Sequence, residues 1–179
     1  LVPFAEFCAE SGIDLIQLLP VNDTGTESSP YSALSAFALH PIYLRLGDLP
    51  EAGPFAADIA RLADRHEYRK RFSYGELRHD KTALLRAIFE ASEKTIASSA
   101  ELEKWIGENP WIVEYAVFKN LKRRNFEASW KSWDKMRSPS HAEIRERWNS
   151  PSKRGEHLFH AWVQMRLDGQ FSSAVAACE

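Results

Sequence analysis

The sequence predicts an α/β fold in which one buried parallel strand precedes a mostly helical region. A nearly continuous apolar run, residues 13–21, follows Gly12 and has the sequence IDLIQLLPV. A short apolar run bounded by turn residues is typical of a parallel strand that is covered on both faces. A helical pattern precedes this run, and repeated helix-start signals follow it from Pro54 onward. The order of helix, strand, long loop and further helices supports the α/β assignment.

The first predicted helix spans residues 2–11. Gly12 is expected to terminate it, because glycine readily adopts the left-handed conformation at a helix end. The apolar side of this helix carries Val2, Phe4, Ala5, Cys8 and Ala9. The strand then leads into a long, aromatic-rich loop, and loops at the carboxyl ends of parallel strands commonly hold the functional residues of α/β proteins. Glycine and proline residues between positions 44 and 54 predict the end of this loop.

Capping patterns predict the later helices. Serine followed three residues later by glutamate, the capping box, occurs at Ser73, Ser98 and Ser140. Asn109 and Pro110 are expected to be an N-cap and a first-turn proline. A final helix is expected from about residue 153, because apolar residues recur there at helical spacing. Its core-facing stripe consists of Leu158, Trp162 and Met165, with Phe159, Val163 and Leu167 beside them.

The composition excludes several classes of partner. The chain has 179 residues, 44% of them hydrophobic, and a formal net charge of -2. It therefore has enough apolar residues for a globular core and lacks the basic field that nucleic acid or an anionic membrane would require. No apolar run approaches the roughly 20 residues that cross a bilayer. Cys8 and Cys178 are too few for a disulfide framework and predict buried, reduced side chains in a cytoplasmic protein.

The loop after the predicted strand carries five ordered sequence pieces. They are Leu18-Leu19-Pro20, Thr24-Gly25, Ser29-Pro30-Tyr31, Ser35-Ala36-Phe37-Ala38 and Pro41. This signature resembles the 4-alpha-glucanotransferases, also called amylomaltases or disproportionating enzymes, of glycoside hydrolase family 77. Weaker likenesses at Tyr74-Gly75, residues 114–118, residues 130–133 and residues 159–164 extend the resemblance over essentially the whole chain.

The resemblance implies a fold and an activity. The expected fold is part of a (β/α)8 TIM barrel with one clear barrel strand and a mostly helical insertion. Residues 1–50 would be partial barrel, residues 51–151 the helical insertion subdomain, and residues 152–179 a helix returning to the next strand. The parent protein would move α-1,4-glucan segments between maltooligosaccharides by a retaining mechanism with a covalent glucosyl-enzyme. No redox, nucleotide or metal cofactor is implied.

The resemblance also implies substrate-binding roles for Ser29 and Tyr31, because the Ser-Pro-Tyr motif of the family lines the donor-glucose subsite. From residue type alone, Tyr31 offers a flat face for a sugar ring and a hydroxyl for a sugar oxygen. On residue type alone, the alternative is that the Tyr31 ring packs within the loop and has no binding role. Thr26, Glu27 and Ser28 depart from an aromatic and an acid that some family members use at a secondary glucan surface, so that surface is not expected here. Leu39-His40 likewise replaces a Gly-Asn pair.

Retaining glycosyl transfer requires two carboxyl groups about 5 Å apart. Asp23 and Glu27 are the acids of the loop, and catalysis is one interpretation of them. The favoured alternative is that Asp23 caps a turn through its own backbone and that Glu27 is solvated. The resemblance agrees, because the catalytic acids of the family come from later strands. No catalytic residue is therefore predicted in this chain, and no metal site, since the histidines lack metal-ligand spacing.

Six tryptophans could suggest sugar stacking. Trp105, Trp111 and Trp162 fall on apolar stripes, which favours core packing. Three further tryptophans lie near loops: Trp130, Trp133 and Trp148. The less favoured interpretation of these three is that they flank an acceptor cleft.

The chain ends predict an internal piece of a longer protein, since Leu1 is not methionine and the sequence stops at Glu179 within an alanine-rich helical pattern. The predicted strand would then have unpaired, aggregation-prone edges. A rival interpretation is a helical interaction or scaffold module in which the loop is an ordered cap. The five-part loop signature favours the enzyme, and the oligomeric state is left open.

Overall fold

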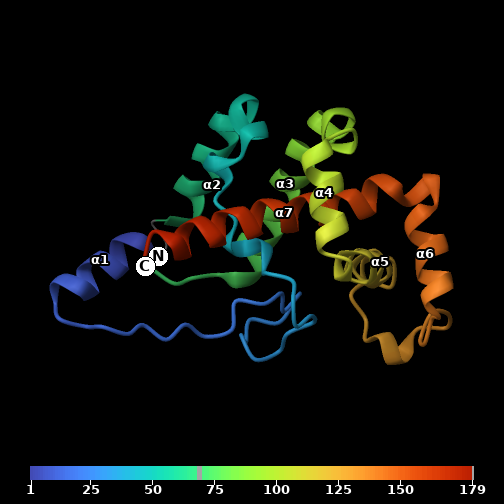
Figure 1. Ribbon diagram of the computed structural model, residues 1–179, viewed down its shortest axis with the longest axis horizontal. Coiled ribbons are helices and arrows are strands. Elements are labelled where there is room, and N and C mark those ends of the chain that lie inside the picture. Colours follow the sequence, from blue (N-terminus) through green and yellow to red (C-terminus); the bar gives the residue numbers. More distant parts are fainter. Residues whose placement is uncertain (68–69, 179) are drawn as a thin grey trace.

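The computed structural model describes residues 1–67 and 70–178, and most of these residues are helical (Figure 1). The α-helices are α1 (Val2–Glu10), α2 (Ala56–Glu67), α3 (Tyr74–Ala97), α4 (Ala100–Glu108), α5 (Trp111–Arg124), α6 (His141–Asn149) and α7 (Arg154–Ala176). Short 3-10 helices are η1 (Pro41–Tyr43), η2 (Leu46–Asp48), η3 (Pro50–Phe55), η4 (Trp130–Ser132) and η5 (Pro151–Lys153). Within the described residues, the β-structure consists of an isolated antiparallel bridge between Asn22 and Leu39.

Helix α7 is the central axis of the molecule, and α3, α4, α5 and α6 pack along it (Figure 1). Residues 157–165 are all buried, so this stretch of α7 is covered on every side rather than along one stripe. The predicted stripe of Leu158, Trp162 and Met165 is confirmed as part of this core. Phe89 of α3 packs against α7, with ring-centroid distances of 5.6 Å to Phe159 and 5.7 Å to Trp162.

The capping predictions are confirmed in part. The capping box at Ser140 forms, because its side chain accepts a hydrogen bond from the Glu143 amide while the Glu143 carboxylate accepts one from the Ser140 amide. Ser99 caps α4 in place of the predicted Ser98, which instead follows the end of α3. Ser73 precedes α3 without a capping bond from its side chain. Pro110 is the N-cap of α5, one residue later than predicted.

The predicted buried strand at residues 13–21 is not formed in this structure. The segment runs extended along one edge of the molecule, and Leu15 is 81% exposed and Leu19 57% exposed (Figure 1). A parallel strand needs hydrogen-bonded neighbours at its edges and covering layers on its faces. Apart from the His40 amide, which donates to the Val21 carbonyl at the end of the segment, the described residues supply neither, so the prediction of a buried strand is wrong for this chain taken by itself.

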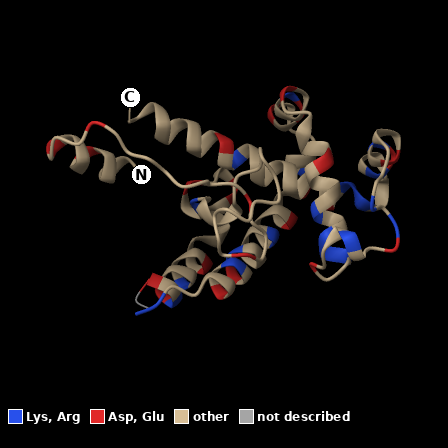
Figure 2. Cartoon of the chain, turned by 90° about the horizontal axis from the view of Figure 1, so that it is seen from below, with Lys and Arg blue, Asp and Glu red and all other residues tan. Residues whose placement is uncertain are grey.

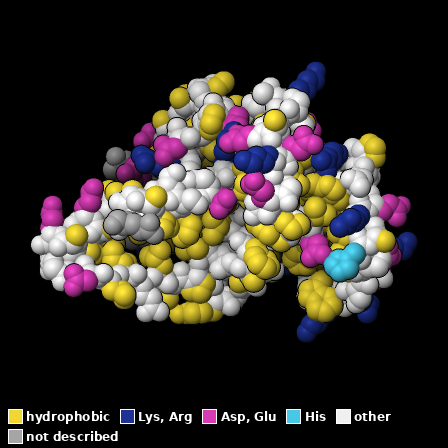
Figure 3. Space-filling view, in the orientation of Figure 1, with side chains coloured by type: hydrophobic (Ala, Val, Ile, Leu, Met, Phe, Trp, Pro, Cys, Tyr) yellow, Lys and Arg dark blue, Asp and Glu magenta, His cyan; other side chains and the backbone are white. Residues whose placement is uncertain are grey.

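The first helix is confirmed, and Gly12 ends it with a φ of +75°. Its apolar side is only partly covered, since Phe4 is 56% exposed while Cys8 is buried. The prediction that both cysteines are buried is wrong for Cys178, which is exposed near the end of the chain. An apolar groove of about 930 Å³ lies between the extended segment and α7. Figure 3 shows hydrophobic side chains gathered along this edge and in the hollow beside it.

The tryptophans pack mainly as predicted. Trp162 is fully buried, and Trp105 and Trp111 are partly buried against the core. Trp133 and Trp148 are also buried, which favours core packing over an acceptor cleft, whereas Trp130 is 45% exposed.

Charged residues of both signs are spread over the helices, and basic side chains are most concentrated near the end of α5 (Figure 2). Two of these cations have partners within the molecule: Arg123 pairs with Glu156 at 2.7 Å, and Lys122 donates to the Glu127 carbonyl at 2.9 Å. None of the helices in the described part of the chain has the length and apolar character needed to cross a membrane.

Candidate functional site

The loop of residues 22–40 is closed at its base by backbone hydrogen bonds. The Asp23 amide donates to the Ala38 carbonyl at 2.8 Å, and the His40 amide donates to the Val21 carbonyl at 2.9 Å. These bonds hold the outgoing and returning arms of the loop side by side. Gly25 is required in the outgoing arm, because its φ is +63° and a Cβ there would lie 2.6 Å from Cδ1 of Leu34.

Ser29 and Tyr31 lie at the exposed tip of this loop. Tyr31 is 74% exposed, and Ser29 is also exposed. A turn within the tip is closed by the Ser32 amide, which donates to the Ser29 carbonyl at 3.1 Å. The structure therefore places both predicted site residues on the same surface, and the Tyr31 ring is open to solvent rather than packed.

Asp23 is the centre of a buried polar network that joins the loop to α5. Its Oδ1 accepts from the Gly25 amide at 2.9 Å, and its Oδ2 accepts from Tyr115 Oη at 2.7 Å and from Lys119 Nζ at 2.8 Å. Burial alone would raise the pKa of Asp23, but the Lys119 charge and the hydrogen bonds from Lys119, Tyr115 and Gly25 outweigh it and lower the pKa to about 2. The carboxylate is therefore ionised and has both oxygens occupied.

A second connection joins the loop to α3 through His40 and Tyr74. The Ile42 amide donates to Nδ1 of His40 at 3.0 Å, so Nδ1 is unprotonated and Nε2 carries the hydrogen. Nε2 then donates to Tyr74 Oη at 2.6 Å, and Tyr74 Oη donates to the Gly25 carbonyl at 2.8 Å. Burial lowers the pKa of His40 and raises the pKa of Tyr74, so both side chains remain neutral.

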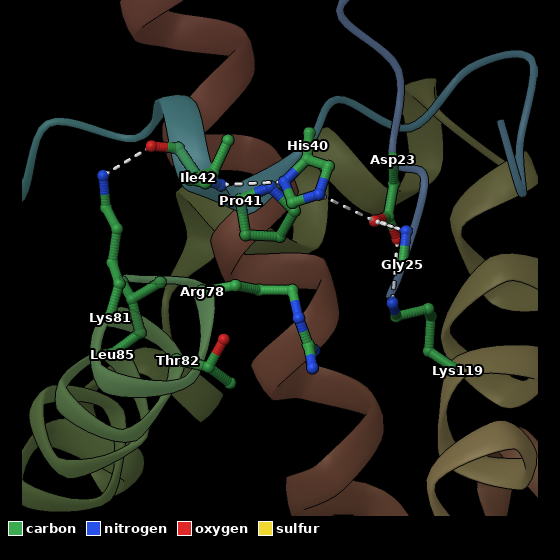
Figure 4. Close-up of a pocket in the computed structure, with 10 residues that line it drawn as sticks. All are labelled: Asp23, Gly25, His40, Pro41, Ile42, Arg78, Lys81, Thr82, Leu85 and Lys119. Atoms are coloured by element: carbon green, nitrogen blue, oxygen red, sulfur yellow. Dashed lines mark hydrogen bonds and ion pairs between the residues drawn. The ribbon is translucent and has the colours of Figure 1, made fainter. Parts of the chain in front are cut away.

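A small polar cavity of about 40 Å³ lies between these two connections (Figure 4). Figure 4 shows Arg78 reaching from α3 into the cavity, with His40 above it and the Asp23–Lys119 pair beside it. Lys81 lies at the opposite side and donates to the Ile42 carbonyl at 2.6 Å. Burial lowers the pKa of Lys81 to about 8.

The acids of the loop are not arranged for glycosyl transfer. Asp23 is 1% exposed and fully hydrogen-bonded, whereas Glu27 is exposed. The turn-capping interpretation of Asp23 is confirmed by its bond to the Gly25 amide two residues later. No cluster of three or more histidine, cysteine, aspartate or glutamate side chains close enough to hold a metal ion occurs in residues 1–67 and 70–178.

The model of the 4-alpha-glucanotransferases, glycoside hydrolase family 77, matches residues 1–179. The chain belongs to this family. It is 32% identical over 181 residues to the 4-alpha-glucanotransferase DPE2 of Oryza sativa subsp. japonica, which covers 96% of this chain and 19% of that protein. It is 29% identical over 185 residues to the 4-alpha-glucanotransferase of Thermus thermophilus, covering 98% of this chain and 35% of that one.

The fold is similar to the crystal structure of amylomaltase from Corynebacterium glutamicum. The TM-score is 0.67 at 22% sequence identity, and the match covers 99% of this chain and 25% of that one. The chain thus spans between 19% and 35% of the length of these relatives.

The residues that anchor the loop were not predicted from the sequence. Tyr115 and Lys119 are four residues apart and so face the same side of α5, which is the one signal that could have paired them. In the sequence, Tyr74 stands out only as part of a family likeness. His40 stands out only as a departure from the family pattern, yet the structure places it at the base of the loop.

Proposed function

We propose that the whole protein is a 4-alpha-glucanotransferase that transfers α-1,4-glucan segments between maltooligosaccharides. The match of the family model over residues 1–179 is the observation that carries this proposal. In the proposed reaction, one carboxylate attacks the anomeric carbon to form a covalent glucosyl-enzyme, and a second carboxyl group protonates the leaving oxygen. The 4-hydroxyl of another glucan then attacks the anomeric carbon, transfers its proton to the second carboxylate and releases the first carboxylate. Both carboxyl groups are proposed to lie outside this chain.

The proposed role of this chain is to present Ser29 and Tyr31 to the donor glucose. The exposed ring of Tyr31 supports this role, because a flat aromatic face can lie against the C–H surface of a sugar and its hydroxyl can bond a sugar oxygen. We further propose that residues 13–21 become a strand of a (β/α)8 barrel when the other strands are present. Their exposed leucines would then be buried, residues 51–151 would form the helical insertion and residues 152–179 the returning helix. The whole protein is proposed to act in the cytoplasm.

The activity is tested by incubating the full-length protein with maltotriose and separating the products. Glucose together with longer oligosaccharides is the expected result, and the 179-residue chain alone is expected to give none, since the loop acids Asp23 and Glu27 are not arranged for glycosyl transfer. Hydrolysis to glucose without longer products would contradict transfer. Transfer by the 179-residue chain would contradict the placement of the carboxyl groups.

Tyr31 is tested in the full-length protein. Tyr31→Ala should lower kcat about ten- to a thousandfold, equivalent to about 1.4 to 4 kcal/mol of lost transition-state stabilisation. Tyr31→Phe should lose less, because the ring remains. Since the ring is exposed, neither variant should change the melting temperature appreciably. Normal turnover in Tyr31→Ala would exclude the donor-site role.

The rival function, a helical scaffold module, would leave the protein inactive on every glucan. Nothing in the comparisons favours that alternative, because the matched proteins are named as transferases.

A further inference from the structure

In addition to the backbone bonds at its base, the loop that carries Ser29 and Tyr31 has a side-chain connection in which one hydroxyl group meets both arms. Tyr74 Oη accepts a hydrogen bond from His40 on the returning arm and donates one to the Gly25 carbonyl on the outgoing arm, at 2.6 and 2.8 Å. The two arms belong to the loop, whereas Tyr74 belongs to α3. One atom of the helical region therefore ties both arms together at one point.

The chemical roles in this connection are fixed by its surroundings. The Ile42 amide occupies Nδ1 of His40, so the imidazole can only donate through Nε2. The hydroxyl of Tyr74 then has a single hydrogen, which it directs to the Gly25 carbonyl. The neutral His40 ring and the neutral Tyr74 hydroxyl can therefore form both hydrogen bonds at once. A phenylalanine at this position would remove both bonds while keeping the ring.

The tip of the loop has few other constraints. Beyond the base, the bonds that hold the tip are local, such as the Thr24 hydroxyl donating to the Glu27 carbonyl at 2.5 Å. Within the described part of the chain, the side chains of Ser29 and Tyr31 form no hydrogen bonds to other residues. The direction in which the tip extends is therefore determined where its two arms are joined.

We propose that Tyr74 is a positioning residue for sugar binding by Ser29 and Tyr31. Its hydroxyl, together with the backbone bonds at the base of the loop, fixes the orientation of the two arms and so presents the tip to the glucan in one arrangement. Tyr74 does not touch the sugar in this proposal, which rests on the proposed transferase function. Positioning groups of this kind act mainly on turnover, because a small misplacement of a reacting group costs more in the transition state than in ground-state binding.

The chain offers a matched control in Tyr43. The rings of Tyr43 and Tyr74 both meet the His40 imidazole edge-on, at centroid distances of 6.1 and 5.7 Å. Tyr43 is 59% exposed, and its hydroxyl has no hydrogen-bond partner among the described residues. In the full-length protein, Tyr74→Phe should lower kcat on maltotriose about tenfold with less than about a twofold change in KM. Tyr43→Phe should leave both constants unchanged.

A double-mutant cycle separates positioning from general stability. If Tyr74 acts through Tyr31, then Tyr74→Phe should cause little further loss of kcat in a Tyr31→Ala background. Losses that multiply in the double variant would overturn the proposal, as would normal turnover in Tyr74→Phe. If Tyr74→Phe lowers kcat only because the variant is partly unfolded at the assay temperature, as its melting temperature would reveal, the proposal is also overturned.

Amide hydrogen exchange provides a readout that does not depend on activity. Tyr74→Phe should speed exchange in residues 26–38 about tenfold or more relative to wild type, while α5 and α7 keep their protection. Unchanged exchange in the loop would overturn the proposal. If the wild-type protein transfers no glucan, the proposed function fails, and the exchange result alone then decides whether the Tyr74 hydroxyl fixes the loop.

Discussion

Gln164 of α7 pairs with both backbone groups of Leu39, which lies 125 residues earlier in the chain. The Leu39 amide donates to Oε1 of Gln164 at 2.9 Å, and Nε2 of Gln164 donates to the Leu39 carbonyl at 2.8 Å. The side-chain amide thus provides the two bonds that a neighbouring strand would provide. Gln170 forms the same pair with Arg45, at 2.8 and 2.9 Å. Two turns of one helix therefore hold the segment that follows the loop.

Gln164→Leu should destabilise the protein by about 2 to 3 kcal/mol. Gln164 is 2% exposed, so its removal leaves the amide and carbonyl of Leu39 without partners in a largely buried site. Gln170→Leu is the matched control and should cost less than about 1 kcal/mol, because water can replace the lost bonds at that more exposed pair. Urea denaturation monitored by circular dichroism measures both. Equal losses in the two variants would contradict the argument from burial.

Asp23→Asn should destabilise the protein by about 3 kcal/mol. The substitution removes the charge that compensates Lys119, whose side chain is 16% exposed, and breaking one partner of a buried pair is costly. Asp58→Asn, which breaks the exposed pair of Asp58 with Arg61, should change stability by less than about 0.5 kcal/mol. The double variant Asp23→Asn/Lys119→Met should recover part of the loss. If Asp23→Asn is as stable as wild type by urea denaturation, the network contributes nothing.

The same pair predicts a dependence of stability on pH. The pKa of Asp23 is lowered from 3.8 to about 2 in the folded state, which corresponds to about 2 kcal/mol of stabilisation. Because the folded pKa is the lower one, this stabilisation is present above about pH 4 and is lost as the pH falls toward 2. The stability difference between wild type and Asp23→Asn, measured at pH 6, 4 and 2.5, should therefore shrink at the acidic end. A constant difference over this range would contradict the assignment to Asp23.

Replacing the exposed leucines of residues 13–21 with lysine should have opposite effects in the 179-residue chain and in the full-length protein. In the 179-residue chain, Leu15→Lys with Leu19→Lys should reduce aggregation, measured by light scattering, without lowering the melting temperature, because both side chains are exposed. Phe126 is 95% exposed and lies outside this segment. Phe126→Lys is therefore the control for replacing an exposed apolar side chain with lysine. In the full-length protein the leucine double variant should prevent folding or activity if this segment is a buried barrel strand. Full activity there would contradict the barrel proposal.

Local sequence signals predicted most of the helical architecture. The capping box at Ser140, the helix end at Gly12 and the core stripe of α7 are all present, because each depends on residues within a few positions of one another. The turn at Asp23 is predictable for the same reason. The signature of the loop also gave the family, which the match over residues 1–179 confirms.

Long-range contacts decided the rest. An apolar run such as residues 13–21 becomes a strand only where other chain segments supply hydrogen bonds and cover its faces, and the described residues do not, so it lies extended and exposed. Tyr74, Tyr115 and Gln164 look in sequence like ordinary helical residues. They anchor the loop because α3, α5 and α7 bring their polar atoms within hydrogen-bond reach of Gly25, Asp23 and Leu39.

The sequence by itself determined which segments are helical, where the loop with the Ser-Pro-Tyr motif lies and which family contains the chain, because those properties depend on local spacing and motif. Only the tertiary structure decided how that loop is held. A buried polar group is stable only with a partner, and the packing of α3, α5 and α7 determines which partner each group of the loop meets.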